Sequence, residues 1–106
     1  FNVVAKSKKQ NAGAVLIRGI YPQNGVKIMK KNRKTKDLKK LTDGPGKLTR
    51  AMDITMKQYG EDITKKPGLY IKDGIRIKKI IQKPRIGISR GLEKHWNFSF
   101  DIRDYL

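Results

Sequence analysis

The sequence predicts an α+β fold in which a mainly antiparallel, open barrel-like sheet packs against about two helices. Short runs of β-branched and aromatic residues recur at both ends of the chain, separated by glycine, proline and asparagine. Two stretches in the first half instead repeat apolar residues at helical spacing. The length of 106 residues is enough for one small domain with a modest core, or for a piece of a larger domain.

The chain opens on two predicted strands that form a hairpin. FNVVA, at 1–5, is a short apolar run that ends where KSKKQNAG becomes polar. AVLIRGI, at 14–20, is nearly continuous in apolar character, as a strand buried on both faces would be. Arg18 interrupts this second strand, and Tyr21 and Pro22 close it. We therefore expect an arginine embedded in an otherwise apolar hairpin.

The segment 24–37 is predicted as a helix with a strongly basic end. Val26 and Met29 lie on one side of it, and Asn32 or Arg33 could continue that side. Seven of the eleven residues in KKNRKTKDLKK, at 30–40, are lysine or arginine. A charge run of this kind is more often a solvated face or a mobile loop than a site. Its functional contribution would be nonspecific attraction of phosphates.

The best helix is predicted for 45–58, where apolar residues follow a 3.6-residue period at Leu48, Ala51, Met52 and Met56. Pro45 suits the first helical position, and Thr42 or Asp43 could cap the helix. The glycines around Pro45 also permit close approach of a ligand to the backbone. Lys47 places a positive charge in the first turn, which the helix dipole disfavours. A nucleic-acid phosphate bound there would relieve this conflict.

The second half is predicted to form short strands between glycines and prolines, at 69–73, 75–81 and 85–89. NFSFDIR, at 97–103, alternates apolar and polar residues and is predicted as a strand with one buried face. We expect Trp96 in the core and His95 at the surface.

Charge gives the strongest indication of the partner. Twenty-six lysines and arginines against nine acids give a net charge of +17 and a pI near 10.3. An anionic partner would relieve the self-repulsion, and nucleic acid is the leading candidate. A membrane surface fits less well because the basic helix has no Trp, Phe or Leu on its apolar side. With no cysteine and one histidine, thiol nucleophiles and Cys- or His-rich metal sites are excluded, and no cofactor is expected.

Five motifs follow one another in a recognisable order: AVLIRGIYP, DGPGKLTRAMDI, LYI, PRIGIS and HWNFSF. Each motif alone is weak. The combination of GPGKL, A-x-x-I and, about forty residues later, RIGI is specific. In this order the chain resembles the second half of the methylpurine DNA glycosylases, the 3-methyladenine glycosylases of the alkyladenine type. The resemblance extends over essentially all of the chain.

The resemblance implies an enzyme that flips a damaged purine out of duplex DNA and hydrolyses its N-glycosidic bond with a positioned water. It assigns Asn2 to the edge of the flipped purine. Arg18 matches the residue that holds the nucleophilic water, and the main-chain carbonyl of Ile86 matches the group that helps to place it. Gly46 and Lys47 match the turn that contacts a DNA phosphate.

Other interpretations of two of these residues stay open. Arg18 could form a structural ion pair with Asp53 or Asp101, and Asn2 could be an edge-strand residue without a role. The whole chain could also be a noncatalytic basic nucleic-acid-binding module of the ribosomal-protein type, which its charge and size fit equally.

The resemblance also implies that this chain is incomplete. The family's catalytic carboxylate, its base-stacking aromatic residues and its intercalating tyrosine lie upstream of the matching region. We therefore expect 1–106 to be the C-terminal portion of a larger domain, inactive alone and monomeric when joined to its upstream half. Its partner would be duplex DNA with a damaged purine, inside the cell in the nucleus or nucleoid.

Overall fold

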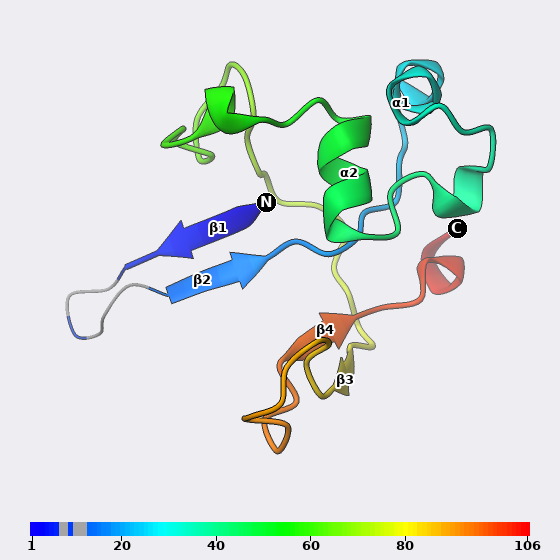
Figure 1. Ribbon diagram of the computed structural model, residues 1–106. Coiled ribbons are helices and arrows are strands. Elements are labelled where there is room, and N and C mark those ends of the chain that lie inside the picture. The colour runs from blue at the N-terminus through cyan, green and yellow to red at the C-terminus, as the bar shows by residue number, and fades with distance from the viewer. Residues whose placement is uncertain (7–8, 10–12) are drawn as a thin grey trace. The chain divides into compact units, whose positions relative to one another are not determined.

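A computed structural model describes residues 1–6, 9 and 13–106, in two compact units, Phe1–Tyr70 and Ile71–Leu106 (Figure 1). In this described part of the chain, two α-helices and two small antiparallel sheets are formed, which confirms the α+β class. The antiparallel sheet is present as two separate two-stranded ladders, one in each unit. Within the same residues, no helix combines the length and the hydropathy that crossing a bilayer requires.

The first ladder is the predicted hairpin. β1 (Asn2–Ala5) pairs antiparallel with β2 (Gly13–Leu16), with Asn2 opposite Leu16. A further hydrogen bond, 3.0 Å from Ile17 N to the carbonyl of Phe1, extends the ladder. The polar connection predicted between the strands lies largely outside the described residues.

The prediction for the second strand is wrong in two respects. β2 ends at Leu16, so that Arg18 follows the strand instead of interrupting it. The strand is also exposed along its whole length, and Val15 is 60% exposed where burial on both faces was expected. Apolar patterning predicts that a strand tends to be buried, but burial also requires a second layer.

α1 (Val26–Arg33) is shorter than the predicted 24–37. It begins after Gly25 (φ 73°) and ends at Lys34, which adopts the left-handed conformation (φ 54°) and donates its N–H to the carbonyls of Lys30 and Lys31. The helix therefore stops in the middle of the basic run. A 3₁₀ turn, Leu38–Lys40, follows after the end of the helix.

α2 (Pro45–Ala51) begins at Pro45 as predicted. Its N-cap is Gly44, and no side chain caps it, so the prediction of a Thr42 or Asp43 cap is wrong. These two side chains have other partners: the Thr42 hydroxyl donates to the carbonyl of Ile20, at 2.8 Å, and the Asp43 carboxylate accepts from Lys47, at 2.9 Å.

The helix predicted over 45–58 breaks at Asp53, which adopts a positive φ of 54°. After the break, Thr55 caps a separate 3₁₀ turn, Met56–Gln58. Met56 consequently leaves the apolar face on which its spacing had placed it, and its side chain is 78% exposed.

A small core is formed by residues of α2 and of the segment just before it. Leu41, Leu48 and Ala51 are 0–1% exposed, and Thr42 is 2% exposed. The Asn32 side-chain amide of α1 donates to the carbonyl of Ala51 at 2.9 Å. This hydrogen bond holds the two helices together on the side of α1 that carries Asn32.

In the second unit, β3 (Ile81–Lys83) pairs antiparallel with β4 (Asn97–Ser99). The Tyr105 hydroxyl accepts hydrogen bonds from the N–H groups of Lys78 and Lys79, at 2.8 and 3.3 Å. Its ring packs edge-on against Phe100 at 5.6 Å between centroids.

Several strands predicted for the second half are not formed. Residues 69–73 and 85–89 are irregular, and only the last residue of 75–81 lies in a strand. The segment 97–103 forms a strand to Ser99 and then a 3₁₀ turn, Ile102–Tyr105, capped by Asp101. The composition of 69–73 and 85–89 suits strands, but neither segment pairs with another strand in the described residues.

Candidate nucleic-acid interface

The start of α2 leaves open space beside Gly46. A Cβ built on Gly46 would meet no heavy atom within 4 Å. At Gly44 the situation differs, because a Cβ there would lie 3.4 Å from Cδ of Lys47. The aliphatic stem of Lys47 therefore lies over Gly44, while the backbone at Gly46 is accessible to a ligand.

The Lys47 ammonium already has an anionic neighbour in the chain. Its Nζ lies 2.9 Å from Oδ1 of Asp43, and both side chains are about half exposed (45% and 49%). The hydrogen bond from Lys47 lowers the pKa of the Asp43 carboxyl. Asp43 thus already offsets part of the unfavourable charge that the sequence led us to expect a phosphate to relieve. A phosphate would have to share Lys47 with Asp43 or displace it.

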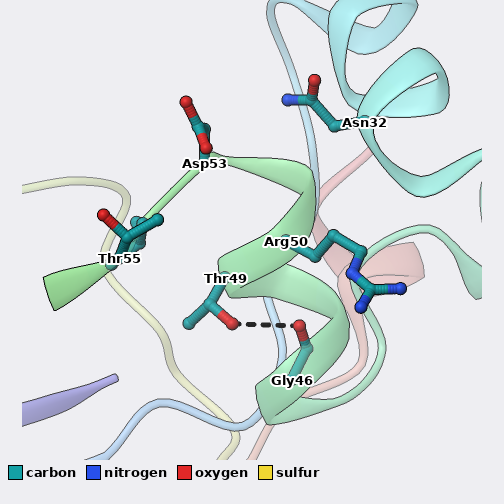
Figure 2. Close-up of a pocket in the computed structure, with 7 residues that line it drawn as sticks. Asn32, Gly46, Thr49, Arg50, Asp53 and Thr55 are labelled. Atoms are coloured by element: carbon teal, nitrogen blue, oxygen red, sulfur yellow. Dashed lines mark hydrogen bonds between the residues drawn. The ribbon is translucent and has the colours of Figure 1, made fainter.

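A polar hollow of about 420 Å³ lies along α2 beside α1, and Figure 2 shows the side chains around it. The Thr49 hydroxyl donates to the carbonyl of Gly46 at 2.9 Å, as the dashed line in Figure 2 shows. Arg50 is exposed and forms no salt bridge within the described residues. The full lining is Asn32, Gly46, Thr49, Arg50, Asp53, Ile54 and Thr55.

Sequence reasoning missed Thr49 and Arg50. The signal was available in the helical spacing, because residues three apart on a helix share one face. Thr49 is three residues after Gly46, and Arg50 is three residues after Lys47. The candidate phosphate-binding turn therefore continues along α2 with a hydroxyl and a second cation.

Asn2 and Arg18 lie at the same end of the hairpin. Asn2 is exposed at the start of β1, opposite Leu16, and Arg18 is half-buried two residues after the end of β2. Within the described residues of the first unit Arg18 forms no salt bridge, so the ion pair with Asp53 is not formed. Asp101 belongs to the second unit, where its carboxylate pairs with Arg103 at 2.6 Å, and its pairing with Arg18 stays a prediction.

Two hydrogen bonds connect the segment after Arg18 to the segment before α2. Ile20 N donates to the carbonyl of Thr42 at 3.2 Å, and the Thr42 hydroxyl donates to the carbonyl of Ile20 at 2.8 Å. Gly19 is also close, since a Cβ on it would lie 3.6 Å from the Thr42 carbonyl oxygen. The first unit thus contains four of the five predicted site residues, with a short bonded path between the hairpin end and α2.

Ile86, the fifth predicted residue, belongs to the second unit. It is 60% exposed and precedes Gly87, which has a positive φ of 75°. Its pairing with Arg18 around a water stays a prediction.

Trp96 was expected in the core, and this prediction is wrong. Its side chain is 55% exposed. Two cations lie near its ring, with Lys94 Nζ at 4.5 Å and the Arg85 guanidinium carbon at 5.5 Å from the centroid. Cations approach aromatic rings favourably, so this tryptophan can remain at the surface. His95, next to it, is exposed as predicted.

Three of the nine acids, Glu61, Asp62 and Glu93, are exposed and lie in irregular segments or turns. A hydrogen bond from Thr64 lowers the pKa of Asp62. Within the described residues, no three His, Asp or Glu side chains gather into a group that could hold a metal ion.

Comparison with known proteins gives the family. The family model described as methylpurine-DNA glycosylase matches residues 1–103. The chain belongs to the methylpurine-DNA glycosylase family, as the order of its motifs had indicated.

Curated relatives agree with this assignment. A protein of Prosthecochloris aestuarii named "Putative 3-methyladenine DNA glycosylase" is 45% identical over 87 residues, covering 80% of this chain and 41% of the relative. A protein of Bacillus subtilis with the same name is 42% identical over 100 residues, covering 92% of this chain and 50% of the relative. The chain therefore spans about half the length of the curated relatives it matches. No solved structure matches it.

Proposed function

We propose that this chain is part of a DNA glycosylase that removes alkylated or deaminated purines from duplex DNA in base-excision repair inside the cell. The observation that carries the proposal is the family match over residues 1–103. The net charge of +17 supports a polyanionic substrate. The proposed reaction class is hydrolysis of an N-glycosidic bond, and we expect no cofactor.

In the proposed reaction the damaged nucleotide leaves the base stack and enters a pocket, at a cost that is lowest for damaged or mispaired bases. The water oxygen forms a bond to C1′ of the sugar while the bond from C1′ to the purine nitrogen breaks, and its electron pair leaves with the purine. We assign Arg18 and the carbonyl of Ile86 to holding this water. Asn2 would contact the purine edge and disfavour the amino group of guanine.

A carboxylate must take the proton from the water and stabilise the positive charge that develops on the sugar. We propose that this group comes from the upstream half of the same protein, which would make the complete protein monomeric and the present chain inactive alone. Two observations support this. The chain spans about half the length of the relatives it matches. Apolar side chains of its hairpin are also exposed, with Val4 at 71%.

The proposed phosphate contact is made by Gly46 and Lys47. The open space at Gly46 supports close approach of a phosphate oxygen to the backbone, and the half-exposed Lys47 ammonium supports ion pairing. Because Asp43 shares this ammonium, binding would exchange an intrachain carboxylate for a phosphate.

Single-turnover release of hypoxanthine or a methylated purine from duplex DNA tests the proposal. The chain is compared alone and joined to the part of the Bacillus subtilis relative that the match leaves uncovered. Release is expected only from the joined protein, and Arg18→Ala should reduce its rate. Arg76→Ala, at an exposed arginine of the second unit, is the matched control. If the joined protein releases no base from a broad panel of lesions, the glycosylase proposal fails.

The alternative function is a noncatalytic basic nucleic-acid-binding module, which the net charge of +17 favours. Lys47→Glu separates the two functions. A glycosylase that holds one phosphate through Lys47 should lose much of its affinity for lesion DNA, whereas a diffuse binder should lose little. Lys72→Glu, at an exposed lysine of the second unit, provides the same charge change as a control.

A further inference from the structure

α1 and the residue that ends it carry four lysines. Successive residues of a helix advance by about 100°, so Lys27, Lys30 and Lys31 fall within roughly one quarter to one third of its circumference. Lys34 follows at the C-terminal end, where the backbone leaves the helix. Lys27, Lys31 and Lys34 are exposed and Lys30 is half-buried. We refer to these four residues as the lysine stripe.

The opposite side of α1 is occupied by the rest of the first unit. Asn32, which donates to the carbonyl of Ala51 in α2, lies about 150° away from the centre of the lysine stripe on the helix circumference. Val26 and Met29 are half-buried. Contact with α2 thus fixes the rotation of α1 so that the lysine stripe faces away from α2.

Arg33, in the same basic run, has a different role. Its Nε donates to the carbonyl of Leu41 at 3.1 Å and its guanidinium also donates to the carbonyl of Lys40 at 2.9 Å. These bonds fold the 3₁₀ turn back onto α1. The rigid, five-donor guanidinium is used for structure, and the stripe consists of lysines alone, which bind phosphates as point charges.

Few acidic side chains neutralise the charge of the lysine stripe. In the described part of the chain none of its four members forms a salt bridge. Asp37 is the only acid between 27 and 40 in the sequence, and its carboxylate accepts the backbone N–H of Lys39 at 3.0 Å. Eight cations against one acid leave this segment with a charge of 8 − 1 = +7.

We propose that the lysine stripe binds the phosphate backbone of duplex DNA outside the lesion, as a second contact separate from Gly46 and Lys47. The inference rests on the proposed function in taking DNA as the partner. From Lys27 to Lys34 the stripe is ~10 Å long, which corresponds to about three successive phosphates of one strand along the duplex axis. Its members follow one another along the axis of a helix whose rotation is fixed, which suits a row of anions.

An anionic membrane is the competing partner. A helix that lies on a membrane inserts an apolar face beside its basic face. In α1 the side opposite the lysine stripe contacts α2, and Ile28, 66% exposed, is the large apolar side chain left at the surface. The geometry therefore favours DNA over a membrane as the partner of the lysine stripe.

The test measures affinity for a short undamaged duplex as a function of salt. Neutralising the lysine stripe (Lys27→Gln, Lys30→Gln, Lys31→Gln and Lys34→Gln together) should reduce the slope of log affinity against log salt by about 2.7, or three phosphate contacts at about 0.9 each. Replacing the same four lysines with arginine should preserve the slope.

The matched control neutralises four exposed lysines of the second unit, Lys72, Lys78, Lys79 and Lys83. It lowers the net charge equally and should change the slope by less than about 1. Equal effects of the two glutamine variants would overturn the proposal, because binding would then depend on total charge. An unchanged slope in the stripe variant would overturn it too.

Vesicles of phosphatidylcholine and phosphatidylserine in equal parts test the competing partner. If the stripe variant loses vesicle binding but keeps its DNA affinity, the stripe is a membrane contact and the proposal is wrong. Because undamaged DNA is used, the result does not depend on base release. A protein that releases no base can still show the slope change, and an active glycosylase can lack it.

Discussion

Replacing Gly46 with alanine should stabilise the fold and weaken DNA binding at the same time. Gly46 is the second residue of α2, does not have a positive φ, and has no heavy atom within 4 Å of a built Cβ. Alanine is favoured over glycine in a helix, and the gain at a compatible position is about 0.4–1 kcal/mol. For a unit of this size that corresponds to a rise in Tm of about 2–8 °C.

The same methyl group would occupy the space through which a phosphate approaches the backbone. Loss of one hydrogen bond to a charged group costs about 1.5–3 kcal/mol, or roughly a 10- to 160-fold increase in Kd. Thermal unfolding by circular dichroism measures the first effect. Fluorescence anisotropy with a duplex carrying an uncleavable lesion analogue, bound by the joined protein, measures the second.

Gly74→Ala is the control for this experiment. Gly74 also has open space around a built Cβ, lies in an irregular segment of the second unit, and is not assigned to DNA contact. Its substitution should leave Kd unchanged. A higher Tm with unchanged Kd for Gly46→Ala would refute the phosphate contact, and a lower Tm would refute the local geometry of α2.

Three further predictions follow from named contacts. Asp43→Asn should strengthen DNA binding by a small factor in a filter-binding titration, because the exposed carboxylate that pairs with Lys47 no longer competes with a phosphate; weaker binding would contradict the exchange. Leu48→Ala should lower the free energy of unfolding by about 2–5 kcal/mol in urea, since Leu48 is 1% exposed; a loss below about 1 kcal/mol would mean that this core does not stabilise the unit. The hydrogen bond from Arg103 lowers the pKa of Asp101 from 3.8 to about 2, so its stabilising contribution should be fully present above pH 3.8 and lost as the pH falls through about 2. An NMR titration of the Asp101 carboxyl should give that midpoint, and Arg103→Ala should return it towards 3.8.

The helices were partly predictable from the sequence because their starts carry local signals. Pro45 marks the first residue of α2, and the spacing of Leu48 and Ala51 identifies its buried face. The helix ends were not predictable. α1 ends at Lys34 and α2 breaks before Asp53, both with positive φ in residues that carry no strong termination signal.

The strands were less predictable than the helices because they depend on partners. The hairpin of β1 and β2 follows from two apolar runs with a polar connection. In the second unit, apolar runs of similar composition had different outcomes, and Ile81 pairs while Ile71 and Ile75 lie in irregular backbone. Composition describes what a segment can bury, whereas pairing depends on which other segments reach it.

For the candidate site, the sequence provided residue types and the structure added their neighbours. The resemblance selected Gly46 and Lys47, but no motif indicated that Asp43 holds the lysine ammonium. No motif indicated that Arg33 donates hydrogen bonds to two backbone carbonyls either. The contacts of Lys47 and Arg33 were not predictable because the direction of a side chain depends on the folded backbone. Trp96 shows the same difference, since it is exposed and two cations lie near its ring.

The paired hydrogen bonds between Ile20 and Thr42 have a consequence for how a lesion would be located. Thr42 is nearly inaccessible to water, so its hydroxyl has no alternative partner in solvent and the connection is expected to persist. Arg18 is two residues from one side of this connection, and Gly46 is four residues from the other. If Gly46 holds a phosphate, the connection fixes the distance along the DNA backbone between that phosphate and the sugar that reacts. A nucleotide at any other distance would then be bound at its phosphate without losing its base.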